Sequence, residues 1–216
     1  MTTAIRFAAL EIAMQRPYLK SHLVPLLIVI AIITVINPGP LGALGLCAGL
    51  AMLIPSYMFS LDERGRLDTL YSVLPLSRTN VVHGRYVVLL ALTLALLSMG
   101  AVLTAARAAL TGPSVDLAEL AIVFGGSFFL VAIVHGFQVP FYFAVGYSKA
   151  RIVNYAILIV FFGALWLVFP AVRLDMVHFT DRLNSPFFYA ITVLGGLGIL
   201  GASVASSSRL YRNRVL

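Results

Sequence analysis

Charged side chains are scarce in this chain of 216 residues. Asp, Glu, Lys and Arg together make up 11% of it and hydrophobic residues make up 61%, whereas about a quarter of the residues in soluble domains are charged. This composition excludes an ordinary soluble domain and predicts a polytopic membrane protein. Cysteine is nearly absent as well. Cys47 lies alone inside an apolar run, so neither a disulfide framework nor a thiolate metal site is expected.

The sequence also lacks the motifs of known membrane-embedded chemistry. It has no H-E-x-x-H zinc motif and no paired aspartates within its apolar runs, and Gly125-Gly126-Ser127 lacks the surroundings of a nucleophile elbow. A G-x-x-x-x-G-K-[ST] phosphate loop is missing too. We therefore expect a chain that is not catalytic by itself, binds no metal or cofactor, and does not hydrolyse ATP by the P-loop route.

Six apolar runs fill most of the chain and predict an all-α membrane domain over residues 1–216. We expect transmembrane helices at residues 22–36, 41–61, 81–106, 119–141, 152–171 and 185–208. Residues 3–20 precede these runs and predict an interfacial helix, in which Phe7 and Leu10 share one side and Glu11 supplies polarity.

Basic residues are distributed unevenly about the apolar runs. With both termini inside, the cytoplasmic side collects twelve of them and the outside collects three. The cytoplasmic set is Arg6, Arg16, Lys20, Arg64, Arg66, Arg78, Arg85, Lys149, Arg151, Arg209, Arg212 and Arg214, and the outer set is Arg107, Arg173 and Arg182. The positive-inside rule therefore predicts a multi-pass protein with both termini in the cytoplasm. Because the arginines form no single patch, the net charge of +7 reflects topology and nucleic acid is not an expected partner.

The charged stretch between the second and third runs is the most informative part of the chain. Apolar residues recur there at helical spacing, which predicts a short amphipathic helix over residues 62–76 on the cytoplasmic membrane face. Its apolar face consists of Leu67, Leu70, Tyr71 and Leu74, and its polar positions include Asp62, Glu63, Arg64 and Asp68. Pro75 ends this helix, and Ser77 or Thr79 is placed to cap the next one. A packing device at the membrane interface is the alternative to a binding surface.

Few polar residues interrupt the apolar runs. We expect no Asp, Glu, Lys or Arg inside a span, whereas ion-driven carriers usually bury such a group as a relay or an ion site. His135 and Gln138 lie late in the fourth run and Asn154 lies early in the fifth. These three are candidates for an inward-facing substrate path, and hydrogen bonding between helices is the alternative.

The order of these features resembles a known family of transport proteins. The stretch DERGRLDTLYSVLPLSRTNVVHGRYVVLL carries the phrase LPLSR, followed by a V-x-G-[RK]-Y pattern, between the second and third runs. With the interfacial N-terminal helix and four further runs, this is similar to the permease subunits of ABC-2 type ATP-binding cassette exporters. The small six-span bacterial group is the most similar part of that class. The motif-level similarity covers residues 62–90.

The resemblance implies that residues 62–76 form a coupling helix that docks on a separate cytoplasmic ATPase subunit, which would bind ATP and Mg. The implied coupling residues are Asp62, Glu63, Arg64, Leu67, Asp68, Leu70, Tyr71, Leu74, Pro75 and Arg78. Pro75 and Arg78 would fix the turn back into the third span. A second copy of the chain, or a relative, would complete a transporter of two permeases and two ATPases.

We therefore expect the permease subunit of an ATP-driven exporter in the bacterial cell membrane. Smooth apolar spans favour a hydrophobic or amphipathic substrate, such as a peptide, a lipid or a drug, and antimicrobial peptide export is one such role. Two alternatives remain: an ion-coupled secondary carrier, and a non-transporting membrane scaffold or immunity protein.

Overall fold

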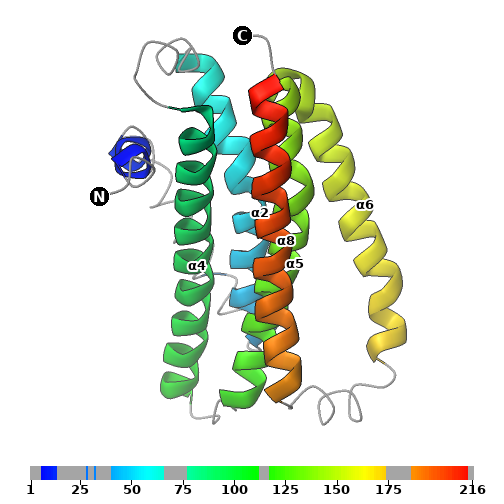
Figure 1. Ribbon diagram of the computed structural model, residues 1–216. Helices are drawn as coiled ribbons and strands as arrows, with labels where there is room; N and C mark the ends of the chain where they lie inside the picture. The colour runs from blue at the N-terminus through cyan, green and yellow to red at the C-terminus, as the bar shows by residue number, and fades with distance from the viewer. Residues whose placement is uncertain are drawn as a thin grey trace.

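The computed structural model describes residues 6–13, 28, 32, 40–65, 77–111, 117–173 and 186–213 (Figure 1). Within these ranges the backbone is helical except at Ser77 and Gly146. The long helices are α2 (Pro40–Gly65), α4 (Arg78–Thr111), α5 (Leu117–Val145), α6 (Tyr147–Arg173) and α8 (Pro186–Asn213). Residues 6–13 form a short helical segment at the side of α4. The all-α prediction is confirmed for the described residues.

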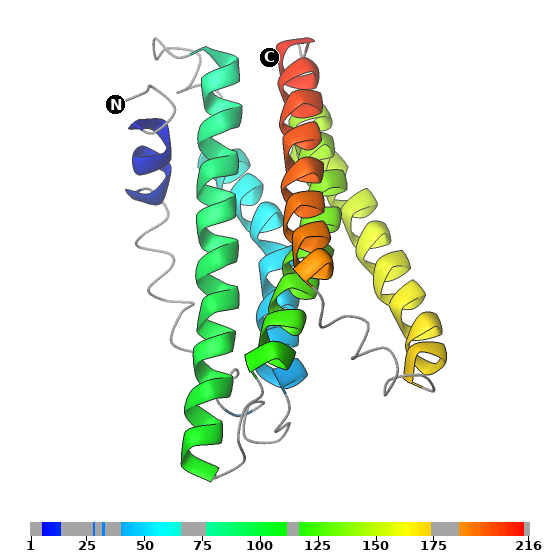
Figure 2. The same cartoon turned by 60° about the horizontal axis from the view of Figure 1, so that its bottom comes forward.

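The long helices run alternately in opposite directions (Figures 1 and 2). The C-terminal ends of α2, α5 and α8 therefore meet the N-terminal ends of α4 and α6 at one end of the bundle. Arg107 and Arg173 lie toward the opposite end. Most of the described basic residues gather at the first end, which we call the basic end: Arg64, Arg78, Arg85, Lys149, Arg151, Arg209 and Arg212.

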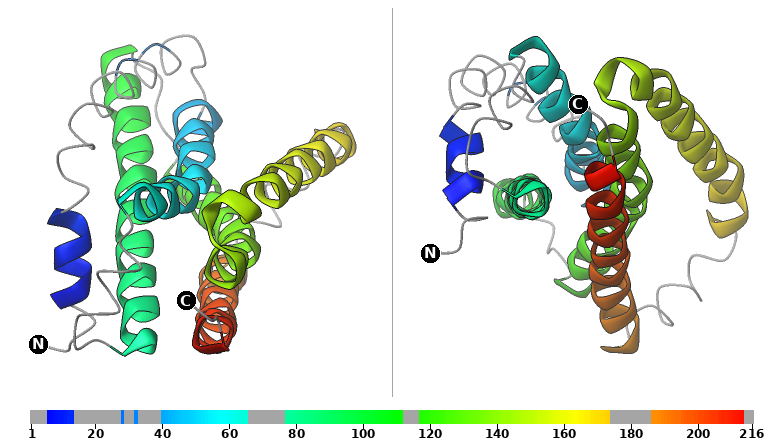
Figure 3. Two further views of the ribbon diagram at one scale, coloured as in Figure 1. Left: turned by 90° about the horizontal axis from the view of Figure 1, so that it is seen from above. Right: turned by 45° about the horizontal axis from the view of Figure 1, so that its top comes forward.

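Helix α5 is central, because it packs extensively against α8 and α2, while α4 packs chiefly against α2. Helix α6 angles away from the other helices with distance from the basic end (Figure 3). The buried apolar residues form two clusters. One, near the basic end, includes Phe7, Met58, Phe59, Val82, Val139, Tyr142, Phe143 and Tyr211, and the other includes Leu44, Ala51, Leu97, Phe128, Val131 and Leu158.

Pro140 lies inside α5 and does not end it, although the predicted fourth span stops at residue 141. A proline has no N–H, so the carbonyl of Gly136, four residues earlier, loses its helical donor. Ser203 of α8 replaces that donor, because its hydroxyl donates to Gly136 O over 3.2 Å. The helix therefore continues to Val145, and Gly146 ends it with a φ of 80°, a conformation that favours glycine.

Four helices are long and apolar enough to cross a membrane: Gly42–Gly65, Arg78–Leu110, Leu117–Val145 and Phe187–Asn213. They correspond to the second, third, fourth and sixth predicted spans. The predicted first span, residues 22–36, lies outside the described residues apart from the helical Ile28 and Ile32. The predicted fifth span lies within α6. The count of six spans therefore stays a prediction, as does the interfacial position of residues 3–20.

Gly100 of α4 marks a close approach to α2. A Cβ atom at this position would lie 3.1 Å from Leu44 Cα and 3.2 Å from the carbonyl oxygen of Ala43, which are backbone atoms that a side-chain rotation cannot move. Gly126 of α5 is the matched control, because its Cβ position meets nothing within 4 Å among the described residues.

We expect Gly100→Leu to lower the free energy of unfolding by about 1 to 3 kcal/mol, the usual cost of overpacking. Gly126→Leu should have little effect, since its side chain enters open space. Thermal unfolding of both variants in detergent measures the difference. Equal melting temperatures would contradict the close packing of α2 and α4.

Candidate functional site at the basic end of the bundle

The stretch predicted as a coupling helix begins inside α2. Asp62, Glu63 and Arg64 form part of the last turn of this helix, which ends at Gly65. The predicted start of a separate helix at Asp62 is therefore corrected, because the α2 backbone continues helical past the predicted span end at residue 61. Arg78 lies in the first turn of α4. The other implied coupling residues, Leu67, Asp68, Leu70, Tyr71, Leu74 and Pro75, lie outside the described residues.

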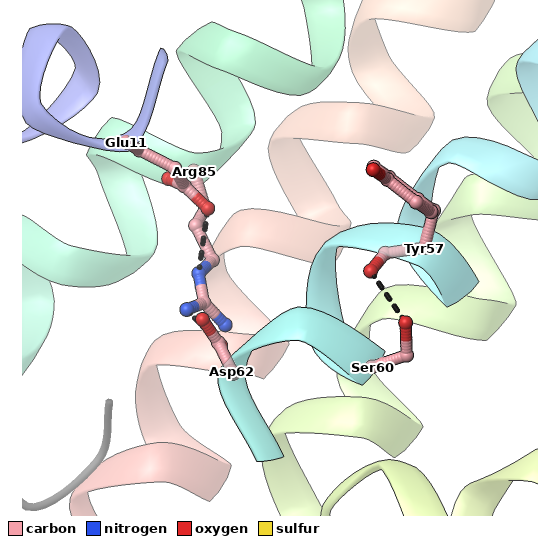
Figure 4. A network of polar contacts seen from close by, with 5 residues as sticks. All are labelled: Glu11, Tyr57, Ser60, Asp62 and Arg85. Atoms are coloured by element: carbon pink, nitrogen blue, oxygen red, sulfur yellow. Dashed lines mark hydrogen bonds and ion pairs between the residues drawn. The ribbon is translucent and has the colours of Figure 1, made fainter. Parts of the chain in front are cut away.

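A buried charged cluster joins three parts of the chain at the basic end (Figure 4). Arg85 of α4 pairs with Glu11 of the N-terminal helical segment at 3.2 Å and with Asp62 of α2. These residues are only 4%, 3% and 8% exposed, respectively. Arg85 and Asp62 both belong to helices that are long and apolar enough to cross a membrane, near the ends of those helices, and the expectation that no charged residue lies inside a span stays a prediction. We call Glu11, Asp62 and Arg85 the charged joint.

Aromatic rings complete the surroundings of the Arg85 guanidinium. Its Cζ atom lies 4.5 Å from the ring centre of Phe59 and 5.6 Å from that of Phe143. A guanidinium is attracted to the negative face of an aromatic ring, most strongly when water is excluded. Phe59 comes from α2 and Phe143 from α5, so Arg85 of α4 contacts three other parts of the chain: the N-terminal segment, α2 and α5.

The N-terminal helical segment presents a different face from the predicted one. Phe7, Ala8 and Glu11 are buried, whereas Leu10 is exposed. Glu11 lies one helical turn after Phe7, and its ion pair with Arg85 compensates part of the cost of burying its carboxylate. Sequence periodicity could not reveal this, because the partner is 74 positions away in the chain.

Glu63 holds the start of α6. Its carboxylate accepts hydrogen bonds from the backbone N–H of Ser148, at 2.8 Å, and from the Ser148 hydroxyl. Ser148 lies in the first turn of α6, where backbone N–H groups have no helical acceptor. A negative charge there also matches the positive end of the helix dipole. Glu63 therefore connects the last turn of α2 to the turn between α5 and α6.

Arg78, a cation, contacts the end of α8, whereas Glu63, an anion, contacts the start of α6. One of its guanidinium nitrogens donates to the carbonyl oxygens of Tyr211 and Arg212, at 3.1 and 3.2 Å, and the guanidinium lies 5.8 Å from the Tyr211 ring centre. These carbonyls belong to the last turn of α8, the negative end of its dipole. Ser77 supplies the predicted cap of α4, because its hydroxyl accepts from the N–H of Asn80 at 3.2 Å.

The three predicted path residues are all buried, His135 and Gln138 in α5 and Asn154 in α6. His135 Nε2 donates to the carbonyl oxygen of Ala51 over 3.0 Å, and Asn154 Nδ2 donates to Ser56 Oγ over 2.8 Å. Gln138 is 1% exposed, and neither atom of its amide has a hydrogen-bond partner among the described residues. His135 and Asn154 thus make the helix-to-helix hydrogen bonds that were the alternative to a substrate path, and the path itself stays a prediction.

The fold and this site define a class of protein before any comparison is made. Long apolar helices whose ends are joined by charged side chains at one end of the bundle are features of a multi-pass membrane domain. Among the described residues, no group of three or more His, Cys, Asp or Glu side chains is placed to hold a metal ion.

Comparison with known proteins identifies the family. The family model described as ABC-2 family transporter protein matches residues 10–212. The chain therefore belongs to the ABC-2 family of transporter proteins, as the LPLSR phrase and its surroundings had indicated. No curated protein and no solved structure matched the chain.

The charged joint makes stability depend on pH through Glu11. Burial raises the pKa of Glu11 from 4.5 to about 7, although the charge and hydrogen bond of Arg85 oppose this rise. Between about pH 4.5 and pH 7, the folded state therefore keeps a proton on Glu11 that the unfolded state has already lost. This contribution is fully present below about pH 4.5 and is lost as the pH rises through about 7.

We expect the melting temperature in detergent to fall between pH 5 and pH 8, and Glu11→Gln to flatten that fall by removing the titrating group. Glu119→Gln, which removes an exposed carboxylate of α5, is the control and should leave the pH dependence unchanged. A pH profile that is the same for all three proteins would contradict the burial of Glu11 in the joint.

Removing all three charges of the joint should destabilise the protein less than removing the charge of Arg85 alone. Arg85→Met leaves the carboxylates of Glu11 and Asp62 buried without their cation, and we expect a loss of about 3 to 5 kcal/mol of unfolding free energy. The triple variant Glu11→Gln, Asp62→Asn, Arg85→Met has no buried charge and should lose less. Unfolding in detergent at constant pH compares the two. A greater loss in the triple variant would show that the ion pairs do not dominate the joint.

Proposed function

We propose that this ABC-2 family transporter protein is the membrane subunit of an ATP-driven exporter, and that residues 62–78 receive motion from a separate ATPase subunit. One observation carries the proposal. On either side of residues 66–76, charged side chains form hydrogen bonds with the ends of other helices. Glu63 accepts from the start of α6, and Arg78 donates to the end of α8. The charged joint adds α4 and the N-terminal segment.

These contacts favour a stiff connection over a loose one. A displacement of residues 66–76 pulls on the last turn of α2 and the first turn of α4, which continue directly from it. Through Glu63 and Arg78 the same displacement acts on α6 and α8. In the proposed cycle, two ATPase subunits close on ATP and Mg, the coupling segments of two paired permease chains move with them, and the helices change the side of access.

The proposed orientation places the basic end in the cytoplasm, because basic residues gather at the side from which a chain is inserted. There the segment meets an ATPase that uses cytoplasmic ATP. The apolar helices support a hydrophobic or amphipathic substrate, such as a peptide, a lipid or a drug. His135, Gln138 and Asn154 are proposed to line its path once the helices separate, because they are buried polar side chains of α5 and α6.

Two pairs of substitutions separate binding of the ATPase from transmission of its motion to the helices. Leu70→Asp with Leu74→Asp should abolish co-purification of the co-expressed ATPase, while the chain still inserts in the membrane. Glu63→Gln with Arg78→Ala should keep the ATPase bound but lower substrate-stimulated ATP hydrolysis by about tenfold or more, since each lost charged contact is equivalent to about 1.5 kcal/mol or more. Arg209→Ala removes an exposed cation at the same end and is the matched control.

The alternatives predict different results. A secondary carrier would transport in reconstituted vesicles without any ATPase, driven by an ion gradient. A scaffold or immunity protein would bind partners with no substrate-stimulated hydrolysis. Retained co-purification after the two leucine substitutions would count against the coupling role of residues 62–76.

A further inference from the structure

Two of the long helices contain an internal proline, Pro55 in α2 and Pro140 in α5. A proline inside a helix has no N–H to donate, so the carbonyl four residues earlier loses its helical partner. For Pro55 this carbonyl belongs to Ala51, and for Pro140 it belongs to Gly136. Membrane helices tolerate such a proline when a neighbouring helix supplies the missing donor.

A side chain from a neighbouring helix replaces the lost donor in both cases. His135 Nε2 of α5 lies 3.0 Å from the carbonyl oxygen of Ala51, and Ser203 Oγ of α8 donates to the carbonyl oxygen of Gly136 over 3.2 Å. A carbonyl oxygen only accepts, so the His135 nitrogen at this contact carries the hydrogen. Ala51, His135 and Ser203 are at most 4% exposed, so bulk water does not compete for these bonds.

The two replacement bonds meet at adjacent residues of α5. His135 donates toward α2, and the carbonyl of the next residue, Gly136, accepts from α8. Gly136 also allows α8 to approach closely, because a Cβ atom there would lie only 2.7 Å from Ile199 Cγ2. A movement of α5 at this level therefore acts on the replacement bonds of both prolines.

A chain of buried hydroxyls connects the bond at Gly136 to α4. Tyr86 Oη lies 2.6 Å from Ser203 Oγ and 2.9 Å from Ser207 Oγ. Ser203 donates its one hydrogen to the Gly136 carbonyl, so its oxygen accepts from Tyr86. The Tyr86 oxygen then accepts from Ser207. Tyr86 directly follows Arg85 of the charged joint in α4, so this hydroxyl chain begins beside the joint.

We propose that Pro55 and Pro140 are two linked hinges, and that His135 and Ser203 are positioning residues that hold these hinges in the arrangement seen. A helix bends most readily at a proline, because one backbone hydrogen bond is missing there. The side-chain donor replaces that bond, so its loss frees the hinge. This role of His135 needs no substrate, and the proposal is independent of the ATPase and of the direction of transport.

A double-mutant cycle in detergent tests whether His135 replaces the donor that Pro55 lacks. His135→Leu should lower the melting temperature by about 2 to 8 °C, the shift expected for one lost buried hydrogen bond in a chain of this size. His135→Gln keeps an N–H donor and should lose less. Pro55→Ala returns a backbone N–H to the Ala51 carbonyl, so the further loss caused by His135→Leu should be clearly smaller in that background.

Gln138→Leu is the matched control for this cycle. Gln138 lies three positions after His135 in α5, is 1% exposed, and its amide has no partner among the described residues. Its substitution should therefore change the melting temperature equally with and without Pro55→Ala. The cycle of Ser203→Ala with Pro140→Ala should repeat the pattern of His135 and Pro55. Additive effects in either cycle would overturn the proposal for that hinge.

A pair of spin labels measures the bending of α2 itself. Labels at Gly45→Cys and Arg64→Cys, in a chain that also carries Cys47→Ala, occupy exposed positions on either side of Pro55. A helical rise of about 1.5 Å per residue places them about 28 Å apart. We expect a narrow distance distribution, a broader one after His135→Leu, and a narrow one again when Pro55→Ala is added. A distribution that His135→Leu leaves unchanged would overturn the hinge in α2.

Discussion

The buried guanidinium of Arg85 is the constraint on which the basic end depends. Removing this cation from water is costly, and the carboxylates of Glu11 and Asp62 and the rings of Phe59 and Phe143 compensate only while they remain in contact with it. Those partners come from the N-terminal segment, α2 and α5. A shift of any one of them leaves a buried charge incompletely paired. The four parts of the chain are therefore held at fixed distances at the basic end of the bundle.

The helix ends near this joint are satisfied by side chains of matching sign. An anion, Glu63, contacts the start of α6, and a cation, Arg78, contacts the end of α8. Glu63 precedes residues 66–76 in the sequence and Arg78 follows them, so the two helix ends are contacted from the two sides of one short stretch of chain. Tyr86 extends the connection, because its hydroxyl bonds Ser203 and Ser207 of α8, and Ser203 in turn donates to the carbonyl that Pro140 leaves free in α5. Polar contacts thus run from α4 through α8 to α5.

The sequence predicts the helices better than it predicts the site. Apolar runs of span length correctly place α2, α4, α5 and α8, because composition alone makes them helical in a membrane. The helix α5 continues past the predicted span end at residue 141, and no local pattern shows that Ser203 supplies a donor to Gly136 from 67 positions away. Arg85 and Glu11 are missed as site residues for the same reason. Each looks like an ordinary interfacial charge, and only their meeting in the fold gives them a role. Residues whose partners are local, such as Ser77 at the start of α4, are predicted correctly.

Gln138 shows that buried polar groups do not all find hydrogen-bond partners among the described residues. At the basic end, ion pairs and hydrogen bonds to helix ends engage the charged side chains, but the amide of Gln138 in α5 is buried with no partner among the described residues. A buried polar group left unpaired costs about 1 to 3 kcal/mol. A contact that paired this amide would therefore add to the stability of the bundle. The contacts at the basic end and the packing in the middle of the bundle therefore differ in kind: charged side chains fix the helix ends at the first, and the second contains a buried amide that has no partner among the described residues.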